Sequence, residues 1–188
     1  MKNQDFINLL PLKTKRLLIK PTTKDDIDMI LKMDKQEQTQ KYLGGIKNKS
    51  REERIKFLEK KENQQKEGKV KSLTVYLKDE IPIGFIGIDI DEQNSTAEIS
   101  YIFDYDYSKK GYCTEACQKI LSVCFKDLKL NKIVADTIDG NIASIKVLEK
   151  LGFTHTKTRK NEAFIEETNE YKDFLDYELL EDNYKDFE

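Results

Sequence analysis

Three short runs of strand-forming residues follow one another in the middle of the chain, separated only by brief polar turns. The runs cover residues 73–77, 82–88 and 97–103, and the turns cover residues 78–81 and 92–95. Val, Ile, Tyr and Phe favour extended backbone, and strands joined by turns this short pair with their neighbours in sequence. The pattern therefore predicts an antiparallel meander, around which the rest of the chain must be arranged.

Helical and extended patterns alternate on both sides of this meander. Before it we expect a strand at 16–20, a helix at 25–33 and a helix at 50–67, the last begun by a capping box of Ser50 and Glu53. After it we expect a helix at 112–128, a strand at 132–136, a helix from Asn141 to Lys150, and strands at 153–159 and 171–180 joined by a polar loop. No repeat, linker or low-complexity tract interrupts this order, so residues 1–188 are expected to form a single α/β domain.

Charge and composition argue against several classes of protein. The 33 Lys and Arg residues nearly balance the 35 Asp and Glu residues, so no strong positive field is available for nucleic acid or an anionic membrane. No segment approaches the roughly 18 consecutive apolar residues of a spanning helix, and the first residues carry no apolar signal core. The three cysteines, Cys113, Cys117 and Cys124, cannot all pair with one another. We therefore expect a cytoplasmic protein with no nucleic-acid or membrane partner.

The segment from Ser108 to Ala116 combines a glycine, two lysines and the expected start of a helix. The first N–H groups of a helix have no partner within it, and a short glycine-containing turn aims them at one point, which suits an anion such as phosphate. Turns of this composition also occur without any ligand. This segment alone therefore leaves both interpretations open.

The segment from Asn141 to Phe153 has the pattern of an asparagine-capped amphipathic helix ended by Gly152. Together, in this order and separated by one strand, the two segments resemble the cofactor-binding core of the GNAT family of acyl-CoA-dependent N-acetyltransferases. Residues 12–19 are similar to the start of the branch that acetylates ribosomal-protein N-termini, and residues 141–153 follow the pattern of that branch. The resemblance implies a GNAT fold of the α/β (α+β) class: a twisted, mixed but mostly antiparallel central sheet of about six to seven strands, flanked by about four helices.

The resemblance also implies where acetyl-CoA, the expected co-substrate, binds. The family's phosphate turn has the form Gln/Arg-x-x-Gly-x-Gly/Ala, and the corresponding residues here are Ser108, Lys109, Lys110, Gly111, Tyr112 and Cys113, with Thr114 next in the helix. Ser108 replaces the usual long polar residue, and Cys113 stands where Gly or Ala is common. We expect the backbone amides of this turn and its lysines to hold the pyrophosphate, and a side chain at Gly111 to crowd the turn.

The rest of the family's cofactor site maps onto one strand and one helix. The pantetheine arm is expected to run along the strand at 98–103, with backbone donors near Ile102 and Phe103 polarising the thioester carbonyl. Asn141 and Ser144 are expected to face the cofactor from the next helix. No metal is expected to take part.

Acetyl transfer needs a neutral amine, donors for the oxyanion and a proton for the departing thiolate. Glu98 is the candidate base because it lies on the strand beside the expected acetyl position; a solvent-facing strand carboxylate is the equal alternative. Many family members donate the proton from a tyrosine at the position of Leu148, so this chain lacks that acid. Ser144 is the substitute that the same branch suggests, unless it contacts the cofactor only.

The favoured interpretation is an acetyl-CoA-dependent N-acetyltransferase that acts by direct transfer in a ternary complex. Its leading acceptor is the α-amine of a protein N-terminus. A small polyamine or an aminoglycoside is the alternative acceptor, and a non-catalytic coenzyme A-binding module is the alternative from another class of protein. The variable segments 34–49 and 158–172 are expected to build the acceptor site, and a homodimer is one allowed assembly. The cysteines are expected to pack the helix after Gly111 against the sheet.

Overall fold

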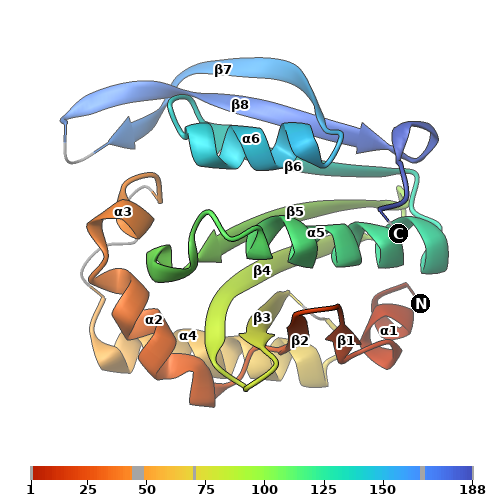
Figure 1. Cartoon of the computed structure of the whole chain (residues 1–188), viewed down its shortest axis with the longest axis horizontal. Helices are drawn as coiled ribbons and strands as arrows, with labels where there is room; N and C mark the ends of the chain where they lie inside the picture. The colour runs from red at the N-terminus through yellow and green to blue at the C-terminus, as the bar shows by residue number, and fades with distance from the viewer. Residues whose placement is uncertain (1, 44–48, 70, 166–167, 188) are drawn as a thin grey trace.

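The computed structural model describes residues 2–43, 49–69, 71–165 and 168–187. Its centre is an eight-stranded sheet in the order β1-β2-β3-β4-β5-β6-β8-β7 (Figure 1). Neighbouring strands are antiparallel except β5 and β6, which run parallel. The strands are β1 (Leu12–Lys13), β2 (Leu17–Pro21), β3 (Ser72–Leu77), β4 (Pro82–Asp91), β5 (Thr96–Phe103), β6 (Lys132–Ile138), β7 (Thr154–Ile165) and β8 (Glu170–Leu180).

Six α-helices occur in the described part of the chain. They are α1 (Lys2–Asn8), α2 (Ile27–Asp34), α3 (Glu37–Gln40), α4 (Arg51–Lys66), α5 (Tyr112–Ser122) and α6 (Ile142–Lys150). A π-helical turn, Val123–Asp127, extends α5. None of the helices in these ranges is long and apolar enough to cross a membrane.

The central meander is confirmed, because β3, β4 and β5 follow one another in the sheet with antiparallel pairing. The helix expected after residue 50 is confirmed as α4, and its capping box forms: Ser50 Oγ accepts from the Glu53 amide at 3.2 Å, and Glu53 Oε2 accepts from the Ser50 amide at 2.7 Å. Local side-chain chemistry therefore fixes where this charged helix begins.

The sheet has eight strands instead of six to seven, and six helices replace the expected four. The additional α1 is short and polar in sequence, but it buries Phe6 completely in the main core. The expected polar loop after residue 159 is instead strand, because β7 resumes its pairing with β8 after an irregularity and continues to Ile165. Tertiary contacts stabilise both α1 and the end of β7, and the local sequence pattern does not indicate such contacts.

Different helices cover the two faces of the sheet. Successive strand residues point to opposite faces, and β4 shows this directly. Ile86 belongs to the main core, to which α5 contributes Ile120, whereas Phe85 packs against Ile30 of α2 and Leu58 of α4. Figure 1 shows α5 and α6 together in front of the sheet. The α5 face and the α2–α4 face are therefore separate surfaces of one sheet.

Strands β5 and β6 pair at one end only. Residues 96–98 of β5 match residues 132–134 of β6, and the ladder then stops although both strands continue, to Phe103 and Ile138. We call the unpaired stretch beyond Glu98 the opening. It interrupts the hydrogen bonding of an otherwise continuous sheet.

The backbone of β5 offers unpaired donors and acceptors to the opening. Asp104 N donates to Ile83 O at 2.9 Å, next to the β4–β5 ladder. Antiparallel ladders alternate between residues bonded to the partner strand and residues that face away, so the amide of Ile102 faces β4 while those of Tyr101 and Phe103 face the opening. A row of polar backbone groups therefore borders the gap, as at the edge of a sheet.

Candidate active site

The turn that leads into α5 is left-handed at two positions. Lys109 has φ 58° and Gly111 has φ 78°, and Gly111 is the residue that caps the helix. Glycine has no side chain to bond the first amides of α5, so these donors point out of the helix end, where an anion can accept from them. Lys109, Lys110 and Gly111 are exposed and Ser108 is half-buried. The turn is thus accessible to a ligand.

The structure changes the reason why this position needs glycine. A Cβ atom at Gly111 would meet Arg16 Nη2 at 3.5 Å, an ordinary contact with the end of a flexible side chain. The expectation that a side chain would crowd the turn is therefore wrong. The requirement comes from the positive φ, which costs an L-residue about 1–2 kcal/mol.

Arg16, from the turn between β1 and β2, holds the Gly111 turn against the sheet. Its Nε donates to Glu115 Oε2 at 2.6 Å, its Nη1 donates to the Lys110 carbonyl at 2.9 Å, and its guanidinium lies 4.5 Å from the centre of the Tyr112 ring. Thr14 Oγ1 donates to Glu115 Oε1 at 2.6 Å. Although burial opposes them, these bonds from Thr14 and Arg16 lower the pKa of Glu115 and keep it charged. The start of the chain thereby fixes a turn distant from it in sequence.

Helix α6 brings Ser144 to the opening. Asn141 caps the helix, its Oδ1 accepting from the Ser144 amide at 3.3 Å. The Tyr101 hydroxyl lies 3.0 Å from Ser144 Oγ and donates to the Ser144 carbonyl at 3.3 Å. Burial raises the pKa of Tyr101, and the neighbouring thiols of Cys117 and Cys113 raise it further. Tyr101 is therefore a neutral hydrogen-bonding partner that links β5 to α6 across the opening.

Glu98 lies at the last pair of the β5–β6 ladder, opposite Val134 on one side and Asp89 on the other. Both of its neighbours along β5 are buried in the main core, so its own side chain points to the other face. Burial raises the pKa of Glu98, and the negative charges of Asp136 and Asp89 raise it further. Glu98 and Ser144 therefore lie on opposite faces of the sheet, one on each side of the opening.

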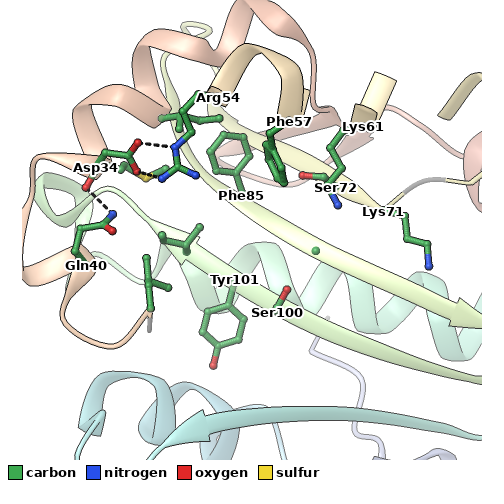
Figure 2. Close-up of a pocket in the computed structure, with 15 residues that line it drawn as sticks. Asp34, Gln40, Arg54, Phe57, Lys61, Lys71, Ser72, Phe85, Ser100 and Tyr101 are labelled. Atoms are coloured by element: carbon green, nitrogen blue, oxygen red, sulfur yellow. Dashed lines mark hydrogen bonds and ion pairs between the residues drawn. The ribbon is translucent and has the colours of Figure 1, made fainter. Parts of the chain in front are cut away.

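A cavity of about 360 Å³ lies on the α2–α4 face, and its floor includes Ser100, Tyr101 and Ile102 of β5 (Figure 2). Gly87 of β4 lies opposite Ser100 and makes room for it, because a Cβ atom at Gly87 would be 2.4 Å from Ser100 Oγ. Ser100 and Ile102 point their side chains toward the cavity, whereas the Tyr101 side chain points to the α5 face, and the backbone of the same stretch borders the opening. A molecule in the cavity would lie next to a group held in the opening.

The polar groups of this cavity lie at its two ends. Figure 2 shows Gln40 and the ion pair of Asp34 and Arg54 at one end, and Lys61 and Lys71 at the other. Arg54 Nε donates to Asp34 Oδ2 at 2.7 Å, and both side chains are largely buried. Between the two ends the lining is mostly apolar.

Glu98 does not line this cavity. It borders a second hollow of about 370 Å³ together with Asp136, Asp176 and Arg159. Arg159 is bound on both sides, its Nη2 donating to Asp136 Oδ2 at 2.7 Å and its Nε to Asp176 Oδ1 at 2.9 Å. Of the two segments expected to build the acceptor site, 34–49 contributes Asp34 and Gln40 to the first cavity, whereas 158–172 contributes Arg159 to the second hollow.

The cysteines have the packing role expected of them. Cys117 and Cys124 are fully buried in the main core, Cys113 packs against it, and all three are free thiols. Within the described ranges, no group of three or more His, Cys, Asp or Glu side chains is placed to hold a metal ion.

Two residues that now belong to the site, Arg16 and Lys61, were not marked by the sequence pattern. Arg16 was the start of an expected strand, and only the resemblance of residues 12–19 to a GNAT branch marked its surroundings. Tyr101 was one of four nearby tyrosines that could line an acceptor pocket, although aromatic residues that alternate along a strand more often serve packing. Lys61 is one of many charges on α4, so the pattern indicated an ordinary solvated helix face.

The sequence pattern of the acetyltransferase (GNAT) domain family matches residues 16–154. One curated relative, an uncharacterized N-acetyltransferase called YnaD from Bacillus subtilis (strain 168), is 36% identical over 89 residues, which are 47% of this chain and 51% of the relative. The chain therefore spans about half the length of this relative in the alignment.

Two solved structures share the fold with TM-scores of 0.78. One is spermidine N-acetyltransferase from Vibrio cholerae in complex with CoA and spermine, at 19% identity over 91% of this chain and 99% of that one. The other is RimL, a ribosomal L7/L12 alpha-N-protein acetyltransferase in complex with coenzyme A, at 17% identity over 90% of this chain and 97% of that one. The family match covers the Gly111 turn, the opening and α6, and the chain belongs to the GNAT family of N-acetyltransferases.

Proposed function

We propose that this GNAT enzyme transfers the acetyl group of acetyl-CoA directly to the α-amine of a protein N-terminus. The opening between β5 and β6 carries the proposal, because its unpaired backbone groups lead along β5 toward the Gly111 turn. RimL, which shares the fold, is named for action on a protein α-amine, and the branch resemblance of residues 12–19 and 141–153 points to the same acceptor class.

The residues present fit the pantetheine arm and the pyrophosphate of acetyl-CoA. The amides of the pantetheine arm can bond to a free strand edge as an added strand would. The pyrophosphate suits the free amides at the start of α5, with Lys109 and Lys110 adding positive charge beside them. We expect Tyr101 and Phe103, rather than Ile102, to supply the amides near the thioester carbonyl, because the amide of Ile102 faces β4.

Each face of the sheet has a separate chemical task. Acetyl-CoA supplies an acetyl group activated as a thioester. On the α2–α4 face, Glu98 lies outside the first cavity and takes the proton of the attacking amine through water. Its raised pKa makes it a stronger base than an ordinary glutamate. On the α5 face, Ser144 is held by Tyr101 and gives a hydrogen bond to the departing thiolate or positions a water that protonates it.

Two alternatives follow from specific observations. The shared fold with a spermidine acetyltransferase supports a small polyamine as acceptor, with an aminoglycoside in the same class of small amines. The absence of tyrosine at Leu148, together with Ser108 and Cys113 in the phosphate turn, supports a non-catalytic coenzyme A-binding module.

Release of free thiol separates these functions. The purified chain is mixed with acetyl-CoA and, in turn, short peptides with a free α-amine, the same peptides blocked at the N-terminus, and spermidine. Peptide-dependent thiol release that requires the free α-amine supports the proposal, and release with spermidine alone replaces it by the polyamine alternative. A chain that binds acetyl-CoA but releases no thiol with any amine is a binding module.

A further inference from the structure

The cavity on the α2–α4 face carries an excess of positive charge. Asp34 and Arg54 are 17% and 7% exposed at their side chains and neutralise each other within the wall. Lys71 forms an ion pair with Asp89, a residue outside the lining. Lys61 forms no ion pair within the described residues. An uncompensated ammonium group therefore borders a largely apolar space.

The position of Lys61 is costly without an anionic partner. The side chain is half-buried, and its ammonium lies 5.2 Å from the centre of the Phe57 ring. Burial lowers the pKa of Lys61, and the nearby charges of Lys60 and Lys71 lower it further, against a smaller opposing effect of the Asp89 charge. A carboxylate placed beside Lys61 would remove this penalty, because an opposite charge favours the ionised amine.

The far end of the cavity offers an acceptor of hydrogen bonds. Gln40 is 5% exposed; its Nε2 donates to the Met33 carbonyl at 3.1 Å, while its Oε1 has no partner among the described residues. A buried carbonyl oxygen without a partner has lost the hydrogen bond it makes in water, and a ligand N–H group would restore such a bond. Ile30, Phe57 and Phe85 line the apolar space between the two ends.

We propose that the acceptor is an amine with an apolar body and a carboxylate, and that Lys61 recognises the carboxylate. The apolar body fills the middle of the cavity, and in a peptide acceptor a backbone N–H group bonds to Gln40 Oε1. This inference rests on the proposed transferase function and selects among its acceptors. A polyamine or an aminoglycoside would instead bring further positive charge next to Lys61, which like charges oppose.

The carboxylate can come from either of two sources. A free apolar amino acid carries it as its main-chain carboxyl group, and a peptide carries it as an acidic side chain near an apolar first residue. Both present a carboxylate to Lys61 and an apolar side chain to the middle of the cavity, and only the peptide has a further N–H group for Gln40 Oε1. The test therefore includes leucine and phenylalanine with their amides, and C-terminally amidated tetrapeptides that begin with leucine and have either Glu or Gln at the third position.

The test compares the parent with Lys61→Met, which keeps an unbranched side chain without the charge, and with Lys60→Met as the matched control. Lys60 is the adjacent residue of α4, is exposed and does not line the cavity. Thiol release gives kcat/KM for each amine, and calorimetry with the CoA-loaded protein measures binding of the same compounds. We expect at least one carboxylate to be preferred to its neutral counterpart by about tenfold or more, in the parent and in Lys60→Met but not in Lys61→Met.

The outcomes separate this inference from the proposed function. A preference within the amino-acid pair alone identifies a small acceptor, and one within the peptide pair alone identifies a protein N-terminus. The inference is overturned if kcat/KM and binding are equal for the carboxylates and their neutral counterparts. It is also overturned if spermidine is the preferred acceptor, or if the preference for a carboxylate survives in Lys61→Met. If no amine releases thiol, the transferase function fails. Calorimetry then tests the role of Lys61 alone: carboxylate binding that is lost in Lys61→Met supports it, and binding that is unchanged in Lys61→Met contradicts it.

Discussion

Substitution of Gly111 should weaken CoA binding, and the loss should be larger for residues that tolerate a positive φ less well. The residue has φ 78° and ψ 6°, a left-handed conformation that costs a residue with a side chain about 1–2 kcal/mol. If the turn escapes this cost by leaving its binding conformation, Kd rises about 5- to 30-fold. Asparagine tolerates the left-handed region and valine avoids it, so we expect the smallest loss for Gly111→Asn, a larger loss for Gly111→Ala and the largest for Gly111→Val.

Calorimetric titration with CoA, and with pantetheine as the ligand that lacks the phosphates, tests this order. Gly152→Ala is the matched control: Gly152 also has a positive φ, 91°, and an added Cβ atom there meets only Leu179 Cδ1, at 3.7 Å. The control should lower the melting temperature without changing CoA affinity. Two results would refute the reasoning: a milder loss for alanine than for the larger asparagine, which would restore crowding as the cause, or equal losses for CoA and pantetheine, which would remove the phosphates from this turn.

Three further predictions concern the proton path and the core. Glu98→Gln should lower kcat about 10²-fold at neutral pH with little change in acetyl-CoA affinity. In a pH–rate profile this loss of kcat should become smaller as rising pH deprotonates the amine. Because the pKa of Glu98 is raised in the folded protein, its ionised form lowers the stability of the fold above that pKa. Glu98→Gln should therefore also melt at a higher temperature than the parent at neutral pH. An unchanged melting temperature would contradict the burial of this carboxyl group. We expect Ser144→Ala to lower kcat at all pH values. Tyr101→Phe should likewise lower kcat without changing its pH dependence, and a double mutant no slower than Ser144→Ala would show that Tyr101 acts through Ser144. Cys117→Ala and Cys124→Ala should each lower stability by about 1–2 kcal/mol in urea unfolding and leave turnover unchanged, whereas a cysteine acetylated in the absence of acceptor, detected by mass spectrometry, would indicate a covalent route.

Local signals predicted the elements that local chemistry determines. Asn141 was expected to begin α6, and its side chain does accept a bond from the Ser144 amide. The meander was predictable because its turns are too short for any partner but the next strand. Gly111 was correctly assigned to a turn before a helix, but its φ could not be derived from the pattern, so the sequence suggested the wrong reason for the residue.

Contacts between distant segments explain what the sequence did not reveal. The bond from Arg16 to the Lys110 carbonyl joins residues that are 94 positions apart in sequence, and no periodic pattern encodes such a contact. The cavity forms because α2 and α4 cover the Phe85 face of the sheet incompletely, which depends on how these helices pack. Only that packing places Lys61 at the cavity, since α4 by itself has the composition of a solvated helix.

If acetyl-CoA binds in the opening as proposed, the short ladder between β5 and β6 makes catalysis and stability depend on the same molecule. Three residue pairs join the two halves of the sheet in this seam, and the rest of the seam lacks cross-strand bonds. A co-substrate that bridges the opening would act as a removable strand, and because it binds only the folded chain, its free energy of binding adds to that of folding. At a free concentration of 100 times Kd, the gain is about 2.7 kcal/mol, enough to slow local opening and proteolysis about 100-fold. The supply of acetyl-CoA would then govern how long each copy of the enzyme survives as well as how fast it works.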